Sequence, residues 1–317
     1  MPEHSARVLV LGAGALGAFY GGVLARAGCA VEVVARSDYD AVAANGYRID
    51  STLGDLSFRP ARVLRAAQAA TPGADFVVVG LKLVPGADRV ALLRPVLGPA
   101  SVIVLVQNGI GIEDEVAGAF PSHEIVSGVA YAAASRLAPG HVRHHSKFTR
   151  LILGRYPAGE GDGASRFAAL LKAGGASVQV SEDIVGARWQ KCAWNTVFNP
   201  ISALGGGLGT SDMLSGEAQV AFARAAIEEV CAVAAADGHP LPADTAATQI
   251  QGTLKLPNYV SSMGQDALAG RPMETEALLG NVVRLARRLS VPVPRLEALY
   301  AMLKMMEARA PKQAAPG

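Results

Sequence analysis

A glycine-rich turn, Gly12-Ala13-Gly14-Ala15-Leu16-Gly17, constrains the fold of this chain more than any other stretch. It directly follows the apolar run 8–11, and a helical pattern leads from it to Gly28. A second apolar run then covers 30–35. This order of strand, turn, helix and strand, with glycines at these spacings, is typical of a dinucleotide-binding βαβ unit. We therefore predict an α/β fold that begins with a Rossmann-type domain.

The residues of this turn have different expected roles. Gly12 allows the tight turn, Gly14 lets the backbone approach a pyrophosphate, and Gly17 lets helix and strand pack closely. With Ala15 and Leu16 they open a helix whose first N–H groups and positive dipole end favour phosphate. We expect these five residues to bind the phosphates of the cofactor.

The residue after the second strand indicates which nicotinamide cofactor is bound. NAD-binding domains usually place an acid about 20 residues beyond the glycines, where it holds the ribose 2′-hydroxyl. Here Arg36 follows the strand, and a guanidinium can hold a 2′-phosphate through paired hydrogen bonds. Glu32 is the rival, but it lies in mid-strand, and a solvated loop cation is the alternative for Arg36. We predict NADP(H) as the cofactor.

Polar residues follow two further predicted strands. The runs 75–80 and 102–106 are apolar on both faces, which suits a parallel sheet covered by helices. Lys82 comes just past the first run and Asn108 just past the second. Because ligands of open α/β sheets bind outside the carboxyl ends of the strands, we expect both side chains to face cofactor and substrate. Solvated loop positions are the alternative.

The pattern changes towards the second half of the chain. Four shorter strand-like runs are expected to extend the same sheet as antiparallel strands; they cover 126–131, 142–145, 151–154 and 177–180. No metal site is predicted, because His144-His145 lacks carboxylates or cysteines at ligand spacing. Beyond Glu182 the patterns are helical. We expect a Rossmann-type NADP-binding domain over 1–182 and an all-helical substrate and catalytic domain over 183–317.

The first helix of that second domain carries a narrow polar stripe. Lys191, Asn195 and Asn199 are four residues apart, so they share one face between apolar neighbours. A solvated line on an amphipathic helix is one interpretation, although such a face is normally broader. A buried stripe is the other, and its ammonium and amides would then need polar partners such as a ligand. The pattern alone leaves both open.

Composition excludes several classes of function. The chain has 317 residues and a net charge of +2, which gives no reason to expect nucleic acid or a membrane as a partner. No uncharged apolar run reaches the about 20 residues that span a bilayer, and we expect no signal peptide. Three scattered cysteines suit a reducing compartment. We expect a cytoplasmic protein with a small-molecule substrate, and a homodimer is the candidate assembly.

Several motifs together resemble the ketopantoate reductase (2-dehydropantoate 2-reductase) family. They are the glycine-rich turn, Arg36, Lys82, Gln107-Asn108-Gly109, the W-x-K-x-x-x-N-x-x-x-N-P helix (189–200), S-S-M-x-Q-D (261–266) and G-R-P-x-E (270–274). The resemblance covers about 7–306. Because the most specific motifs lie in the helical domain, the resemblance extends beyond a shared Rossmann fold.

The resemblance implies a role for each matching residue. Lys191 would donate a proton to the substrate carbonyl oxygen, and Glu274 would contact substrate, with pairing to Lys191 left open. Lys82 and Asn108 would lie near the cofactor. The implied substrate-binding residues are Asn108, Asn195, Asn199, Ser262, Glu274 and, as a looser match, Asn258. Met273 and Glu276 depart from the family's usual Thr-Glu-Ile-Asp, which leaves the exact 2-keto acid open.

The resemblance implies NADPH-dependent reduction of 2-dehydropantoate to (R)-pantoate, in pantothenate biosynthesis. Hydride would go to the C2 carbonyl, with Lys191 as the general acid. Three alternatives remain: reduction of another 2-keto acid, a non-catalytic NADPH-binding regulator, and an oxidative 3-hydroxyacid dehydrogenase. The complete polar set argues against a regulator, and Arg36 disfavours the dehydrogenase, which is expected to prefer NAD.

Overall fold

The computed structural model describes residues 5–52, 54–145, 150–159 and 161–309. The chain forms two compact units. The first comprises Met1–Lys82, Gly86–Asn108 and Ile112–Ala187, and the second comprises Leu83–Pro85, Gly109–Gly111 and Arg188–Gly317. The last boundary falls inside helix α6 (Ile184–Leu204), where the sequence placed it after Glu182.

The first unit is built on an eight-stranded sheet in the order β12-β11-β8-β7-β6-β1-β2-β5. The strands are β1 (Arg7–Leu11), β2 (Ala30–Val34), β5 (Arg62–Leu64), β6 (Phe76–Val79), β7 (Val102–Leu105), β8 (Ile125–Ala130), β11 (Leu151–Tyr156) and β12 (Val178–Val180). All neighbours are parallel except β8 and β11. The predicted Rossmann-type sheet is confirmed. Of the late strands expected to be antiparallel, β11 pairs antiparallel with β8, whereas β8 pairs parallel with β7 and β12 pairs parallel with β11.

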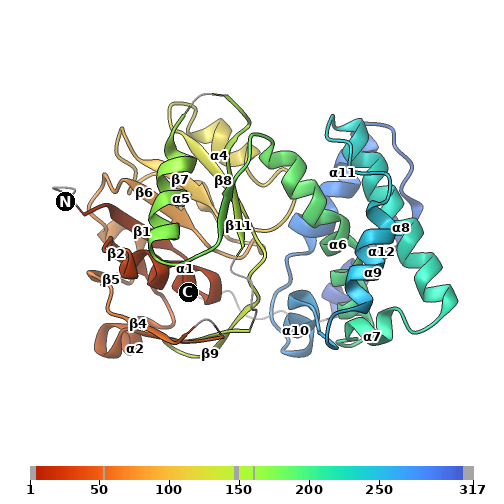
Figure 1. The fold of residues 1–317 in the computed structure, drawn as a ribbon, viewed down its shortest axis with the longest axis horizontal. Coiled ribbons are helices and arrows are strands. Elements are labelled where there is room, and N and C mark those ends of the chain that lie inside the picture. Colours follow the sequence, from red (N-terminus) through yellow and green to blue (C-terminus); the bar gives the residue numbers. More distant parts are fainter. Residues whose placement is uncertain (1–4, 53, 146–149, 160, 310–317) are drawn as a thin grey trace. The chain divides into compact units, whose positions relative to one another are not determined.

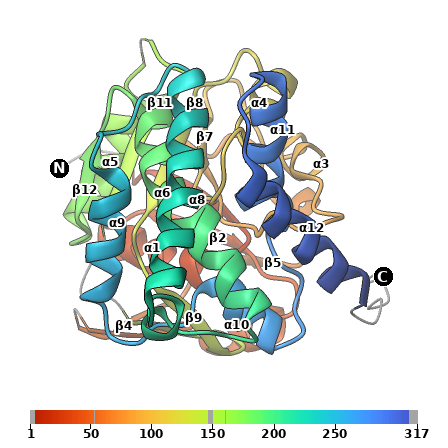
Figure 2. The ribbon, with the colours of Figure 1, turned by 90° about the vertical axis from the view of Figure 1, so that its right-hand side faces the viewer.

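Helices cover both faces of this sheet. Helices α1 (Ala15–Arg26) and α5 (Gly163–Ala173) lie on one face, and α3 (Arg89–Leu93) and α4 (Asp114–Ala119) lie on the other (Figure 1, Figure 2). Every residue of β6, β7 and β8 is buried. Burial on both faces explains why these strands are continuous apolar runs without alternation. The short helix α2 (Tyr39–Asn45) and the 3₁₀ turn η1 (Ala67–Ala69) lie in the connections.

A second, four-stranded sheet packs against α1. Its order is β4 (Leu56–Phe58), β3 (Tyr47–Ser51), β10 (His141–His144) and β9 (Ala134–Ala138). The prediction that 142–145 extends the main sheet is therefore wrong. The physical reason is that α1 is buried all round its middle, from Gly17 to Leu24, so its outer face also needs a cover. His144 belongs to that cover, because its ring stacks on Phe19 at 4.5 Å.

The second unit is helical, as predicted. It contains most of α6, then α7 (Thr210–Met213), α8 (Glu217–Ala236), α9 (Thr245–Leu254), α10 (Ser262–Leu268), the π-helical turn η2 (Glu276–Gly280), α11 (Asn281–Arg288) and α12 (Pro294–Arg309). Helix α8 contacts α9, α11 and α12 and forms the centre of the unit. Within the described ranges, no helix combines the length and apolar character needed to cross a membrane.

Candidate active site

One glycine of the glycine-rich turn, Gly14, is required neither by the packing of the protein nor by its backbone conformation. Gly12 has φ +86°, and a Cβ there would lie 2.7 Å from the backbone nitrogen of Leu81. A Cβ on Gly17 would overlap the carbonyl of Gly12. Gly14 is exposed, has an ordinary φ of −71°, and a Cβ there would meet nothing within 4 Å. Glycine at this position leaves room for a group from outside, as the expected pyrophosphate contact requires.

The second sheet holds this turn in place. Tyr47 on β3 is 2% exposed, and its hydroxyl donates a hydrogen bond of 3.1 Å to the carbonyl of Ala13. Burial raises the pKa of Tyr47; the negative charge of Asp38 raises it further, and Arg136 opposes the rise. Tyr47 is therefore a neutral donor that lies close to both charges. Sequence reasoning missed this contact, because β3 is a strand of only five residues.

Arg36 lies where the sequence placed it. It is exposed directly beyond the carboxyl end of β2. The rival acid Glu32 lies inside β2, and its carboxylate is 3.4 Å from the guanidinium of Arg62. Glu32 is therefore occupied within the strand, and Arg36 is the residue available at the strand end.

The ends of β6 and β7 are tied together. Gln107 donates a hydrogen bond of 2.6 Å to the carbonyl of Leu81 and accepts one of 3.1 Å from Arg89, which is 5% exposed. Lys82 directly follows Leu81, and Asn108 directly follows Gln107, so this tie fixes the backbone beside both predicted residues. Lys82 is exposed and Asn108 partly buried, on neighbouring parallel strands.

The polar stripe of α6 is buried, so its interpretation as a solvated line is wrong. Asn195 is 8% exposed and Asn199 2% exposed, and Lys191 is partly buried. No group of the described residues donates a hydrogen bond to the buried Oδ1 of Asn199. An unsatisfied buried acceptor costs about 1–3 kcal/mol, so a hydrogen-bonding ligand at this amide would be favourable.

Lys191 has the environment of a proton donor. Its pKa is lowered from 10.5 to about 8, chiefly by burial and then by the charge of Arg188, against opposing effects of Cys192 and Glu274. Arg188 is 3% exposed, and its Nη1 donates a hydrogen bond of 3.1 Å to the carbonyl of Gly109. Burial and a cationic neighbour both favour release of a proton near neutral pH. Sequence reasoning did not identify Arg188 as that neighbour.

Glu274 connects the lysine to the segment that follows β6. Its Oε1 accepts a hydrogen bond of 2.9 Å from the backbone N–H of Leu83, which belongs to the second unit. Its charge raises the pKa of Lys191, so the two groups are electrostatically coupled. Both predicted catalytic residues therefore lie in one electrostatic environment of the second unit.

Ser262 and the less specific match Asn258 are at the surface of the second unit. Ser262 is exposed at the first position of α10, whereas Ser261 is fully buried and caps that helix by accepting a bond of 3.1 Å from the N–H of Gly264. Asn258 is exposed, and its Oδ1 accepts a bond of 3.2 Å from the N–H of Ser211. Only Ser262 of the serine pair is available to a ligand.

Of the two departures from the family pattern, Met273 is buried and Glu276 is partly exposed but bonded within the second unit. Met273 is 7% exposed. Glu276 accepts hydrogen bonds from Arg284 at 2.6 Å, Tyr300 at 3.0 Å and Lys304 at 3.0 Å. Although burial opposes it, these bonds hold the pKa of Glu276 below its usual value. Glu276 thus connects η2 to α11 and α12.

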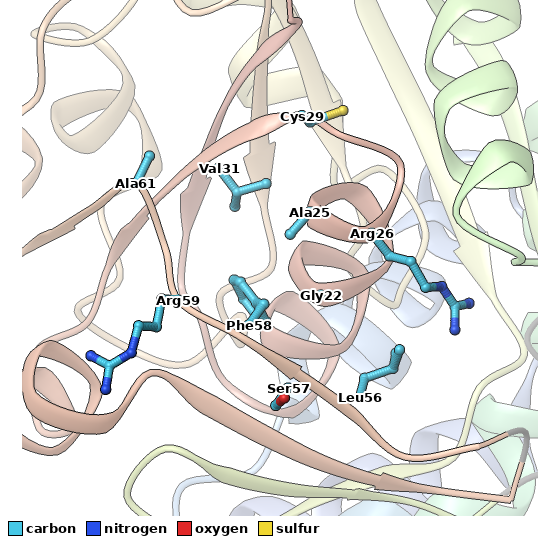
Figure 3. Close-up of a pocket in the computed structure, with 10 residues that line it drawn as sticks. All are labelled: Gly22, Ala25, Arg26, Cys29, Val31, Leu56, Ser57, Phe58, Arg59 and Ala61. Atoms are coloured by element: carbon cyan, nitrogen blue, oxygen red, sulfur yellow. The ribbon is translucent and has the colours of Figure 1, made fainter.

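A cavity of about 400 Å³ in the first unit contains none of the predicted site residues (Figure 3). It lies between α1, β2 and β4, and the guanidinium groups of Arg26 and Arg59 point away from it, to backbone carbonyls at 2.7 and 2.9 Å. Burial raises the pKa of Cys29 in its lining, so this thiol stays neutral. We interpret the cavity as a packing gap. Across the described ranges, no group of three or more His, Cys, Asp or Glu could hold a metal ion.

Both halves of the chain match known proteins. Residues 8–158 match the family model described as Ketopantoate reductase PanE/ApbA, and residues 183–307 match Ketopantoate reductase PanE/ApbA C terminal. The crystal structure of 2-dehydropantoate 2-reductase from Methylococcus capsulatus is 48% identical, with a TM-score of 0.90, and the match covers 98% of this chain and 100% of that one.

Two further proteins place this similarity in context. The 2-dehydropantoate 2-reductase of Nostoc sp. is 29% identical over 305 residues, which is 95% of each chain. A ternary structure of D-mandelate dehydrogenase with NADH and anilino(oxo)acetate has a TM-score of 0.85, over 95% of this chain and 98% of that one. At 18% identity it shows a shared fold alone. The two family models together span most of the chain, which therefore belongs to the ketopantoate reductase family and is a nicotinamide-dinucleotide-dependent oxidoreductase.

Proposed function

We propose that this protein reduces 2-dehydropantoate to (R)-pantoate with NADPH, as a step of pantothenate biosynthesis. The observation that carries the proposal is the buried stripe of α6, which combines an ammonium of lowered pKa with two buried amides. A 2-keto acid offers what such a stripe needs, namely a carbonyl oxygen that develops negative charge and further oxygens that form hydrogen bonds.

The residues of the first unit suit NADP(H). The open space at Gly14 and the N-terminus of α1 would accept the pyrophosphate, and Arg36 would bind the 2′-phosphate. Lys82 and Asn108, at the tied strand ends, would orient the nicotinamide end. When bound, NADPH supplies the hydride that reduces the C2 carbonyl carbon.

The proton comes from this chain. As the carbonyl oxygen becomes an alkoxide, the ammonium of Lys191 stabilises the charge and transfers one proton to that oxygen, which gives the hydroxyl of the product. Asn195 and Asn199 hold the substrate, and Ser262 binds its carboxylate. Glu274 accepts a hydrogen bond from the substrate hydroxyl. Because Lys191 must be protonated, reduction should decline as the pH rises through about 8.

The same machinery would reduce another 2-keto acid, and this is the second candidate. Met273 stands where the family commonly has Thr, one residue before Glu274. A substitution next to an acid that contacts substrate can alter which substituent of the keto acid is accepted. Both candidates share the cofactor and the proton donor, so only the substrate separates them.

The test follows NADPH consumption with 2-dehydropantoate and with a panel of other 2-keto acids. We expect rapid turnover of 2-dehydropantoate. Lys191→Ala should lower kcat about 10²- to 10⁴-fold, the usual contribution of a general acid, and leave NADPH binding intact. Lys255→Ala, at an exposed lysine, is the matched control. Normal turnover by Lys191→Ala would rule out its role, and turnover of another keto acid alone would change the substrate.

We also propose that the protein works in the cytoplasm. All three cysteines, Cys29, Cys192 and Cys231, are free thiols. Free thiols persist in reducing compartments. Cell fractionation that recovered the protein from an oxidising compartment would contradict this location.

A further inference from the structure

A second guanidinium lies beside the loop that follows β2. Arg136, on β9, has Nη2 2.8 Å from Oδ1 of Asp38, and its Nη1 donates to Oγ of Ser37 at 3.4 Å. Ser37 directly follows Arg36. The second sheet thus brings an arginine from a distant part of the chain to the carboxyl end of β2, where a Rossmann-type domain holds the adenosine ribose.

Asp38 fixes this arginine. The carboxylate is buried at 7% exposure, and it also accepts bonds from Ser37 Oγ at 2.9 Å and from the N–H of Gly140 at 3.2 Å. Asp38 comes 21 residues after Gly17, about the spacing at which NAD-binding domains place their ribose-binding acid. Here the acid is used internally: its oxygens hold Arg136 and the loop.

The charges of Asp38 and Arg136 both act on the buried Tyr47, whose hydroxyl donates a hydrogen bond to the carbonyl of Ala13 in the glycine-rich turn. Tyr47 is therefore bonded to the turn and electrostatically coupled to the pair at the end of β2. The side chain of Arg136 is 44% exposed, and its two contacts use two of the five N–H donors of the guanidinium, which leaves three for a ligand.

We propose that Arg136 is a second cofactor-specificity residue, which binds the 2′-phosphate of NADP(H) together with Arg36 and is positioned by Asp38. The proposal rests on the proposed function only in its choice of NADP(H) as cofactor. Two guanidiniums around one phosphate supply paired hydrogen bonds and offset its double negative charge. NADH lacks that phosphate and gains nothing from either residue.

The experiment measures equilibrium binding of NADPH and NADH to the full chain by fluorescence titration. Arg136→Ala should weaken NADPH about 10- to 100-fold, the effect of losing charge-assisted hydrogen bonds, and change NADH less than about twofold. Arg143→Ala is the matched control: it lies on the adjacent strand β10, is 51% exposed and faces Asp50 at 3.5 Å, and it should change neither affinity.

Two further measurements distinguish direct contact of Arg136 with the 2′-phosphate from indirect support of the loop after β2. Adenosine 2′,5′-bisphosphate should lose affinity for Arg136→Ala as NADPH does, while 5′-AMP should not. Arg136→Lys, which keeps the charge beside Asp38 but removes the planar fork, should show an intermediate loss and a normal melting temperature. If the alanine variant misfolds, the lysine variant still decides the question.

The outcomes differ in what they overturn. Equal loss of NADPH and NADH in Arg136→Ala would mean that the residue only supports the loop. An undiminished NADPH preference would remove Arg136 from the phosphate site. A wild-type protein without any preference for NADPH would instead overturn the choice of cofactor, and this proposal with it.

Discussion

Replacing Lys191 with Met should make the folded protein more stable near neutral pH. The pKa of this ammonium is about 8 in the folded protein and 10.5 in an unfolded chain. Since one pH unit of difference is worth about 1.4 kcal/mol, holding the charge inside costs the folded state about 3 kcal/mol. Met keeps an unbranched apolar side chain in the same space and carries no charge, so the cost disappears together with the proton donor.

The effect must depend on pH in a defined direction. Below about pH 8 the lysine is protonated in both states, and the full cost is present. Between about pH 8 and 10.5 only the unfolded chain keeps the proton, so the stability of the wild type rises with pH. The advantage of Lys191→Met should therefore be largest at neutral pH and nearly absent at the upper end of this range.

The chain offers a convenient reporter for this measurement. Its two tryptophans, Trp189 and Trp194, both belong to the second unit, which also holds Lys191. Tryptophan fluorescence during urea unfolding, at neutral pH and near pH 10, therefore follows the relevant unit. Lys255→Met, at an exposed lysine, should change stability at neither pH. A Lys191→Met variant less stable than wild type at neutral pH, or an advantage independent of pH, would refute the reasoning.

Three other substitutions test the surroundings of this lysine. Arg188→Gln removes the charge that helps to lower the pKa of Lys191, so the alkaline decline of the pH–rate profile should move above about pH 8; an unmoved profile would exclude Arg188 from this role. Gly109→Ala places a Cβ against the carbonyl of Ala277 at φ +110°, and urea unfolding should show a loss of more than about 1 kcal/mol. Ser261→Ala removes the cap of α10 and should cost about 1 kcal/mol in the same measurement, and no loss would mean that the cap contributes nothing.

The elements that the sequence predicts well are those encoded within a few consecutive residues. The turn Gly12–Gly17 and its flanking strands form one local motif, and the spacing of Lys191, Asn195 and Asn199 defines one helical face. The spacing leaves open whether that face is buried, because a helical period does not show which elements pack against the helix. The structure shows that the face is buried, because both asparagines have low exposure.

Three residues that the sequence did not reveal come together beside the second sheet. Tyr47, Asp38 and Arg136 come from separate segments, and their sheet consists of strands of three to five residues with no long-period pattern. The strand at His144 was predicted as a strand but assigned to the wrong sheet. Strand propensity describes a single segment, whereas pairing depends on a partner far along the chain.

The second unit is assembled from three separate segments of the sequence. The chain passes between units at five points, after Lys82, Pro85, Asn108, Gly111 and Ala187. A gene fragment that began at codon 188 would encode most of the helices, but its product would lack four backbone groups that bond to them. These are the Leu83 N–H on Glu274, the Gly109 carbonyl on Arg188, the Ile110 N–H on the Ala277 carbonyl at 3.3 Å and the Ile110 carbonyl, which accepts a bond of 2.7 Å from Asn281. The surroundings of Lys191 are therefore not a separable module, and recombination that exchanged helical halves between relatives would have to carry the segments Leu83–Pro85 and Gly109–Gly111 with them.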